Sequence, residues 1–270
     1  MGSKRTILAD GPIGIFDSGV GGLSVLVEIN RLLPAEDIVY MADTANCPYG
    51  NKSLEEIQQL AIKATEFLVS QGAKAIVVAC NTASVAALNT LRSVFPLPFV
   101  GMVPAVKSAS VATRCGKVGI IATDATFQAE LFAHLVSEFA SGIEVLEQSC
   151  PGLVELVEAG ETDSPNTDRL LHQYLQPLLG EGIDTLVLGC THYPFLRPAI
   201  ERLVGPKITI IDTGLPVAKQ VRRVLAANGL TTGRQGDGKV SLYTTGDVEL
   251  FTNVVKRILK SKSTWEMRHR

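Results

Sequence analysis

The sequence has no long hydrophobic run and no excess of charge of either sign. No uninterrupted apolar segment approaches the roughly 18 residues that a membrane-spanning helix needs, so we expect no membrane segment. The 25 lysines and arginines nearly balance the 27 aspartates and glutamates, for a net charge of −2. Because there is no basic stripe, the charge gives no reason to expect nucleic acid or an anionic membrane surface as a partner.

Cysteine is scarce, and the cysteines are odd in number and widely scattered. The five are Cys47, Cys80, Cys115, Cys150 and Cys190. This pattern, without a recognisable signal peptide, favours free thiols in a reducing compartment, and we expect a cytoplasmic location. Residues 1–6 formally fit a myristoylation pattern, but a pattern this short often arises by chance.

Hydrophobic residues are plentiful, at 46% of the 270 residues, which suffices for a sizeable core and more than one domain. Short apolar runs alternate with longer segments of helical periodicity. The expected strands cover residues 13–16, 38–41, 75–79, 118–121, 143–146, 186–189, 208–211 and 242–244. The expected helices cover 22–33, 53–71, 127–139, 167–179, 217–227 and 248–259. Continuous apolar strands suit a parallel sheet covered by helices on both faces, so we predict the α/β class.

The pattern of the first half of the chain is repeated in the second half. "VVACNTAS" at 77–84 resembles "LVLGCTHY" at 186–193, because each apolar run ends at a small residue, a cysteine and polar residues. We therefore expect two pseudo-symmetric, doubly wound domains with mainly parallel sheets that face a central cleft.

Proline and glycine crowd the segment near Val103-Pro104, which predicts a domain boundary there. The first domain would comprise 1–103 and 212–270, and the second 104–211. We expect a surface loop over 231–239 and a frayed basic end over 256–270.

Three polar groups follow the predicted strands. They are Asp17-Ser18-Gly19, Cys80-Asn81-Thr82 and Cys190-Thr191-His192. Ligands of open parallel sheets bind beyond the carboxyl ends of the strands. If helices begin at these groups, their free amides attract carboxylates or phosphates and lower the pKa of a nearby cysteine.

Two thiols on mirrored units suit one reaction in particular. A racemase removes a proton from one face of a stereocentre and delivers a proton to the other face. This task requires two acid–base groups on opposite sides of a planar intermediate, and a duplicated unit supplies that geometry.

Simpler interpretations exist for each of these residues. A free cysteine at a strand end is often only a small buried hydrophobe, and Asp17-Ser18 fits a helix cap. Cys190 and His192 suggest zinc, but other ligands at finger spacing are missing. Cys80 or Cys190 with His192 could instead form a cysteine hydrolase pair. The glycines at 19–22 lack the spacing of a nucleotide-binding loop, and Cys47 has no evident partner.

At these residues the sequence resembles the glutamate racemases, within the cofactor-independent aspartate/glutamate racemase superfamily. The segments that carry the resemblance are "GIFDSGVGGLSVL" (14–26), "ADTANCPYG" (42–50), "ACNTAS" (79–84), "CPGLVELVEAG" (150–160) and "GCTHYP" (189–194). The resemblance implies two α/β domains around an active site, and interconversion of L- and D-glutamate without pyridoxal phosphate, metal or other cofactor. It also implies a homodimer whose D-glutamate feeds peptidoglycan synthesis.

The same resemblance assigns roles to individual residues. Cys80 would act on the α-proton of D-glutamate and Cys190 on that of L-glutamate, with Asp17 assisting Cys80 and His192 assisting Cys190. Glu158 resembles a further acid near the second cysteine. The implied substrate-binding residues are Asp17, Ser18, Pro48, Tyr49, Gly50, Asn81, Thr82, Thr191 and His192.

Two short segments depart from the family pattern. Thr213 follows Asp212 where the family often has serine, and Gly152 stands where a bulkier residue is common. Neither departure touches the proposed proton carriers. The alternatives left open are an aspartate or hydantoin racemase, and a non-catalytic binding protein of the two-lobed periplasmic type.

Overall fold

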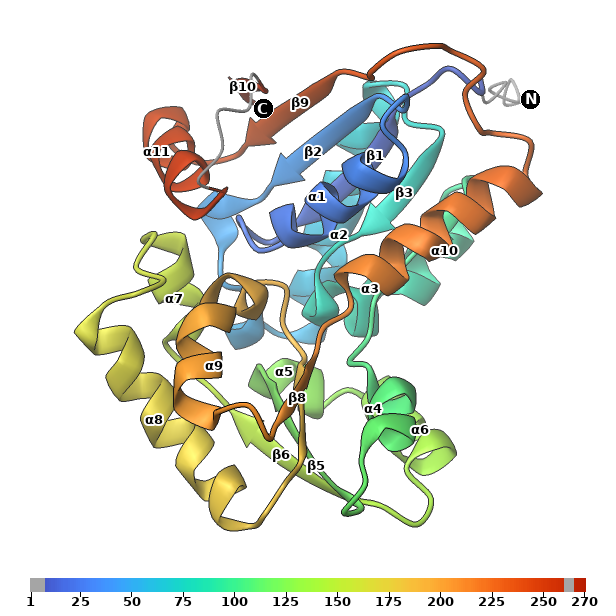
Figure 1. Ribbon diagram of the computed structural model, residues 1–270. Coiled ribbons are helices and arrows are strands. Elements are labelled where there is room, and N and C mark those ends of the chain that lie inside the picture. The colour runs from blue at the N-terminus through green and yellow to red at the C-terminus, as the bar shows by residue number, and fades with distance from the viewer. Residues whose placement is uncertain (1–7, 260–264) are drawn as a thin grey trace.

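The computed structural model describes residues 8–259 and 265–270. Figure 1 shows two lobes, each built on one sheet with helices on both sides. All strand pairings in the described part of the chain are parallel. The predicted α/β class with two doubly wound sheets is confirmed.

The first lobe contains a six-stranded sheet. In spatial order its strands are β10 (Glu266–His269), β9 (Val240–Thr244), β2 (Ile38–Ala42), β1 (Ile13–Asp17), β3 (Ala75–Val78) and β4 (Phe99–Val100). Helices α1 (Leu23–Leu32), α10 (Gly214–Ala227) and α11 (Val248–Leu259) cover one face, and α2 (Leu54–Ser70) and α3 (Asn81–Val94) the other. Ile13 and Ile15 of β1 pack on the first group and Phe16 on the second, as a strand buried on both faces requires.

The second lobe contains a four-stranded sheet in the order β6 (Glu144–Ser149), β5 (Lys117–Ala122), β7 (Thr185–Leu188) and β8 (Thr209–Ile211). Helices α8 (Pro165–Gly180) and α9 (Arg197–Val204) pack on one face, and α4 (Val106–Ala112) and α6 (Glu130–Phe139) on the other. The remaining short elements are α5 (Asp124–Phe127), α7 (Leu153–Glu158) and the 3-10 turns η1 (Thr44–Asn46), η2 (Tyr49–Asn51) and η3 (Tyr193–Leu196).

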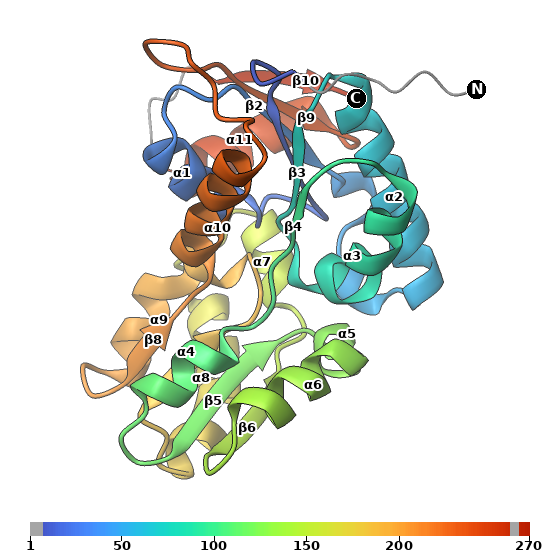
Figure 2. The same ribbon diagram turned by 90° about the vertical axis from the view of Figure 1, so that its right-hand side faces the viewer.

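The two sheets repeat one topology. The order β2-β1-β3-β4 in the first lobe has its counterpart in β6-β5-β7-β8 in the second. The chain passes between the lobes after β4 and again after β8 (Figure 2). β9 and β10 return to the first sheet, and the exact domain boundaries at 103/104 and 211/212 stay a prediction.

Local sequence signals explain where the longest helix begins. Ser53 accepts a hydrogen bond from the Glu56 amide, and the Glu56 carboxylate accepts one from the Ser53 amide, which forms a complete capping box. Gly72, at a φ of 82°, follows this helix in the left-handed region that glycine adopts without strain.

Two local predictions are wrong. The single helix predicted over 127–139 is broken, because Ala129 has extended backbone between α5 and α6. The break lets Phe127 pack edge-on against Phe132, with ring centroids 5.2 Å apart. Of the end predicted to fray, 256–259 belong to α11 and Glu266–His269 form β10, whereas 260–264 lie outside the described residues. The Arg270 guanidinium lies 5.4 Å from the Phe67 ring centroid.

The remaining expectations concern the loop at 231–239, residues 1–6 and membrane-spanning segments. Residues 231–239 form the predicted loop without regular structure. The myristoylation pattern at residues 1–6 lies outside the described residues. Within 8–259 and 265–270, no helix has the length and apolar character needed to cross a bilayer.

Candidate active site

Cys80 and Cys190 occupy equivalent positions in the two halves. Cys80 is the second residue after β3, and Cys190 is the second residue after β7. Both are buried, with exposed fractions of 5% and 8%. Because β3 and β7 hold the same place in their sheets, the repeat delivers one thiol from each lobe.

Cys80 lies at the start of α3, as the sequence suggested. Its sulfur accepts a hydrogen bond from the Ala83 amide at 3.4 Å and lies 3.9 Å from Ser18 Oγ. The expected lowering of the pKa is nevertheless wrong for this cysteine. Burial, together with the negative charge of Asp17, raises the pKa of the Cys80 thiol well above its usual value and outweighs the Ala83 amide.

Asp17 ends β1 and orients the start of the next helix. Its Oδ2 accepts a hydrogen bond from the Gly22 amide at 2.8 Å, whereas Oδ1 is buried without a hydrogen-bond partner among the described residues. Burial raises the pKa of Asp17, although the His192 charge and the Gly22 amide act in the opposite direction. One carboxylate oxygen therefore remains available inside the protein.

A chain of polar contacts runs from Cys190 through His192 to Glu158. The Cys190 sulfur lies 3.7 Å from Nδ1 of His192, and Nε2 of the same ring lies 2.6 Å from Oε1 of Glu158. The Val20 amide donates to that same oxygen at 2.7 Å, so Glu158 of the second lobe is bound to the first.

The imidazole of His192 is buried but well supplied with partners. Burial by itself lowers the pKa of His192, but interactions with Cys190, Cys47 and Glu158 raise it well above the usual value. A ring held between a thiol and a carboxylate can exchange a proton with the thiol and be stabilised as imidazolium by the carboxylate.

Glycines 19 and 21 allow the two lobes to approach each other here. A Cβ on Gly19 would lie 1.9 Å from Oε1 of Glu158, and a Cβ on Gly21 would lie 2.3 Å from Nδ1 of His192. The glycine-rich stretch that the sequence left without a function thus makes room for the His192–Glu158 pair.

The predicted substrate-binding residues differ in whether their polar atoms already have hydrogen-bond partners within the protein. The side-chain amide of Asn81 is buried, and neither its oxygen nor its nitrogen has a hydrogen-bond partner among the described residues. The Tyr49 hydroxyl already donates to Asp43 at 2.6 Å. The Thr191 carbonyl accepts from Ser24 at 2.9 Å.

Hydroxyl groups from both lobes meet at Thr82. Its Oγ1 lies 2.9 Å from Oγ1 of Thr123 and 3.3 Å from Oγ1 of Thr126. A Cβ on Gly50 would lie 3.0 Å from Thr123, so this side of the interface is also close-packed. Nothing in the sequence pointed to Thr123 and Thr126 beyond their position after the strand β5.

The opening beside the predicted site is small. A cavity of about 20 Å³ is lined by Pro48, Gly50, Thr123, Ser149 and Cys150 among others. This volume holds about one water molecule, which is far less than an amino acid. At this cavity the protein therefore leaves no room for an amino acid.

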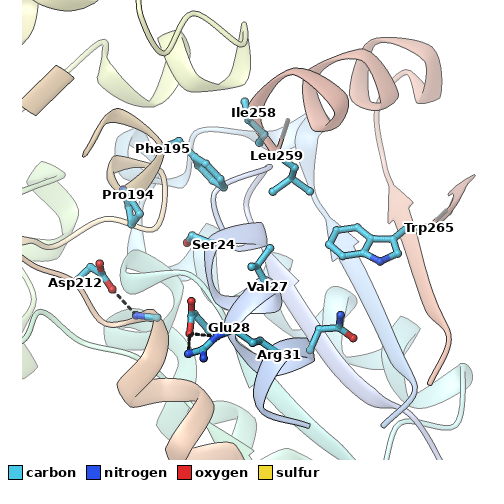
Figure 3. A pocket seen from close by; sticks show the side chains of 12 residues that line it. Ser24, Val27, Glu28, Arg31, Pro194, Phe195, Asp212, Ile258, Leu259 and Trp265 are labelled. Carbon is cyan, nitrogen blue, oxygen red and sulfur yellow. Dashed lines mark hydrogen bonds and ion pairs between the residues drawn. The ribbon is translucent and has the colours of Figure 1, made fainter. Parts of the chain in front are cut away.

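A larger cavity of about 630 Å³ lies elsewhere. Figure 3 shows the side chains around it, which include Ser24, Val27, Phe195 and Trp265 and the charged Glu28, Arg31 and Asp212. None of the predicted site residues lines this cavity. Its size alone does not make it the candidate active site, because it lacks both thiols.

Cys47 was missed by sequence reasoning, which treated it as incidental. Its thiol interacts with His192, and burial raises its pKa to about 11 despite that contact. The available signal was its position just before Pro48, beyond the carboxyl end of β2, the same edge at which Asp17 lies.

Sequence comparison agrees with this arrangement. The sequence model of the Asp/Glu/Hydantoin racemase family matches residues 13–221. The chain belongs to this family. A glutamate racemase from Herpetosiphon aurantiacus is 49% identical over 92% of this chain and 97% of its own length.

Solved racemase structures have the same fold. The crystal structure of a glutamate racemase isoform from Bacillus anthracis superposes with a TM-score of 0.87 at 36% identity, covering 96% of this chain and 97% of that one. A glutamate racemase from Francisella tularensis, solved in complex with D-glutamate, gives a TM-score of 0.82 at 32% identity, with 97% of each chain covered. The resemblance noted from the sequence motifs is thereby confirmed.

Proposed function

We propose that this protein interconverts L- and D-glutamate by a two-base mechanism that uses the thiols of Cys80 and Cys190. The observation that carries the proposal is the equivalent placement of the two buried thiols, one at the end of β3 and one at the end of β7. The racemase family and the names of the relatives agree with it. The reaction as proposed needs no pyridoxal phosphate, metal or other cofactor.

The reaction starts with one of the two cysteines as a thiolate and the other as a thiol. For L-glutamate we assign the thiolate role to Cys190, because it lies against the His192 imidazole, whereas burial and the Asp17 charge disfavour the Cys80 thiolate. In this form Cys190 takes the α-proton of L-glutamate while the Cys80 thiol donates to the other face. The reverse reaction starts from D-glutamate with the two roles exchanged.

The neighbouring groups assist each thiol. Glu158 fixes the His192 ring at Nε2, which leaves Nδ1 facing Cys190 to exchange a proton with it. Asp17 assists Cys80, and its unpartnered Oδ1 is placed to accept a hydrogen bond from the substrate ammonium group. That ammonium group also favours the Cys80 thiolate, because a nearby positive charge stabilises it.

The two substrate carboxylates need donors. We assign this role to amides and hydroxyls of Ser18, Asn81, Thr82 and Thr191, and to the backbone of the Pro48-Tyr49-Gly50 segment. Because the α-proton is very weakly acidic, these donors must stabilise the carbanion-like state by several kcal/mol. Donors already fixed in a closed, dry site serve this purpose best.

Substrate entry requires the lobes to separate, because the cavity beside Pro48 and Gly50 is too small for an amino acid. We propose that the moving units are residues 1–103 with 212–270, and residues 104–211. The lobes would close again before proton transfer.

We further propose a biological setting from the family resemblance. The protein would act in the cytoplasm as a homodimer and supply D-glutamate for peptidoglycan. Its substrate partner is glutamate, and nucleic acid and membranes are not expected partners. Sedimentation of the purified protein tests the dimer.

The alternatives are an aspartate or hydantoin racemase and a non-catalytic binding protein. Circular dichroism of purified protein with each enantiomer of glutamate and aspartate, and with a hydantoin, separates the racemases. We expect the circular dichroism signal of either glutamate enantiomer to decay to zero, and the signals of aspartate and of the hydantoin to stay constant. Tight glutamate binding without any isotope exchange would favour the binding protein.

The proposal is tested by replacing each thiol. Cys80→Ala and Cys190→Ala should each abolish racemisation, because each removes one of two required proton carriers. Cys115→Ala is the matched control, since Cys115 is exposed and should be replaceable without effect. Turnover close to that of the unmodified protein in either site variant would contradict the two-base mechanism.

A further inference from the structure

Cys47, Glu158 and His192 form a cluster of metal-ligating side chains beside the proposed proton carriers. Their ligand atoms all lie within 4.8 Å of one another. They come from three separate places in the chain: the loop after β2, the end of α7 and the segment after β7. The proposed reaction uses His192 and Glu158 but has no need for a thiol at position 47.

The geometry points to an inhibitory binding site for a thiophilic divalent cation, zinc in particular, formed by these three side chains. Thiolate sulfur, imidazole nitrogen and carboxylate oxygen are the ligands that zinc takes in proteins, with a fourth position left for water. Such a set selects zinc over magnesium or calcium, which prefer oxygen ligands alone.

The cluster needs only small movements to bind the ion. Ligand atoms around a tetrahedral zinc lie roughly 3.3–3.7 Å apart, at metal–ligand distances of about 2.0–2.3 Å. Nε2 of His192 and Oε1 of Glu158 are now 2.6 Å apart and would separate by about an ångström. The carboxylate has further lone pairs, so Glu158 can keep the Val20 amide bond while it binds the ion.

The backbone around the cluster leaves space for these side chains. A Cβ on Gly19 would lie 1.9 Å from Oε1 of Glu158 and 3.0 Å from the Cys47 sulfur. The absence of a side chain at Gly19 therefore leaves the space in which the side chains of Glu158 and Cys47 lie close together.

A hydrated cation has a route to the cluster. A cavity of about 190 Å³ is lined by Glu158 and by Asp247, together with Val20, Thr44 and Phe251. Two carboxylates along one cavity raise the local concentration of cations. Glu158 belongs to both the cavity and the cluster, so an ion attracted to the cavity meets the first ligand there.

Binding has a direct consequence for the proposed function. The Cys47 thiol proton and the proton on the ring nitrogen of His192 that binds the ion both leave to solvent, as the sulfur and that nitrogen become metal ligands. The ring can then no longer move or exchange protons freely with Cys190. Inhibition therefore rests on the proposed function, whereas metal binding itself does not.

The binding experiment uses cadmium alone as a spectroscopic probe. We expect wild-type protein to show one thiolate-to-cadmium ultraviolet charge-transfer band that saturates at one ion per chain. Cys47→Ser should abolish this band, because the cluster has no other thiol, and Glu158→Gln should weaken the apparent affinity about tenfold or more. The control Cys115→Ser, at an exposed thiol outside the cluster, should leave it unchanged.

A second variant separates the cluster from the two proton-carrying thiols. Cys80→Ser combined with Cys190→Ser should retain the cadmium band, because Cys47 is still present. Loss of the band in this double variant, with a band unchanged in Cys47→Ser, would overturn the proposal and place the ion on the other thiols.

The inhibition experiment uses zinc alone with the full chain. Zinc should slow glutamate racemisation by the wild type, and Cys47→Ser should require about tenfold more zinc for the same fractional inhibition of its own zinc-free turnover. Equal zinc sensitivity of the two proteins would overturn the inhibitory role. If the protein did not racemise glutamate, the cadmium result would still stand, so the two failures are distinguishable.

Discussion

Nε2 of His192 lies 2.6 Å from Oε1 of Glu158, and the opposite ring nitrogen faces the Cys190 sulfur at 3.7 Å. The second proposed base therefore has a proton partner that is itself fixed by a carboxylate. Cys80 has no imidazole in this role and lies instead near the negative charge of Asp17. The pseudo-symmetry of the fold thus places two thiols in different electrostatic environments, and this difference can be tested.

Replacing His192 should slow the reaction in both directions. We expect His192→Asn to lower kcat/KM roughly 100- to 10,000-fold, the usual contribution of a proton-transfer group. The two enantiomers have equal free energy in solution, so kcat/KM must fall equally for L- and D-glutamate. His172→Asn, at an exposed histidine, is the control and should have no effect. A fall for one enantiomer only would indicate an artefact of the assay.

Removing the charge of Asp17 should change the pH dependence of Cys80. Burial and then the Asp17 charge raise the Cys80 pKa, so Asp17→Asn removes one raising contribution and the pKa falls. At any pH below that pKa, more Cys80 is thiolate. The rate profile for alkylation of Cys80 by iodoacetamide, followed by peptide mass, should shift to lower pH. The rate at exposed Cys115 serves as the reference, and an unchanged or upward shift at Cys80 would contradict the assignment.

A methyl group at Gly21 should damage the site without unfolding the protein. It would lie 2.3 Å from Nδ1 of His192 and 2.6 Å from Oγ1 of Thr191, so the ring must shift. A displacement of about an ångström can cost roughly 100-fold in turnover. Gly180→Ala is the matched control, because a Cβ there has no heavy atom within 4 Å. Turnover of Gly21→Ala equal to the control would show that the ring position does not matter.

A buried ion pair far from the thiols should control stability alone. Lys74 pairs with Glu36, and both side chains are almost fully buried. Lys74→Met leaves a buried carboxylate unpaired and should cost about 3–5 kcal/mol of unfolding free energy. The double variant Lys74→Met with Glu36→Leu should recover part of this loss. Urea unfolding measures both, and a loss below about 1 kcal/mol in the single variant would contradict the argument.

The fold class could be predicted from the sequence, because a strand that is buried on both faces of its sheet is apolar along its whole length. Continuous apolar strands such as 75–79 and 186–189 have no polar face, and only a helix-covered parallel sheet accommodates them. Helix boundaries with strong caps, such as Ser53, were equally readable. Short elements such as the two-residue strand β4 and the six-residue helix α7 were not predicted, because they carry too little periodicity.

Tertiary contacts decided the features that the sequence did not predict. The C-terminal strand depends on pairing with β9, which lies outside any local pattern. The position of Cys47 beside His192 joins residues far apart in the chain. The sign of the pKa shift at Cys80 likewise depends on how deeply α3 and β1 bury it, and the amide field at a helix start was the smaller effect.

The most direct measurement is the fate of the α-hydrogen in heavy water at low conversion. The two-base mechanism predicts that product formed from either glutamate enantiomer carries deuterium at the α-carbon, while the recovered substrate still carries protium. This follows because one thiol removes the hydrogen and the other, already exchanged with solvent, delivers a different one. Product that retains the substrate's own protium from both enantiomers would show that a single base carries the hydrogen across, and would contradict the account.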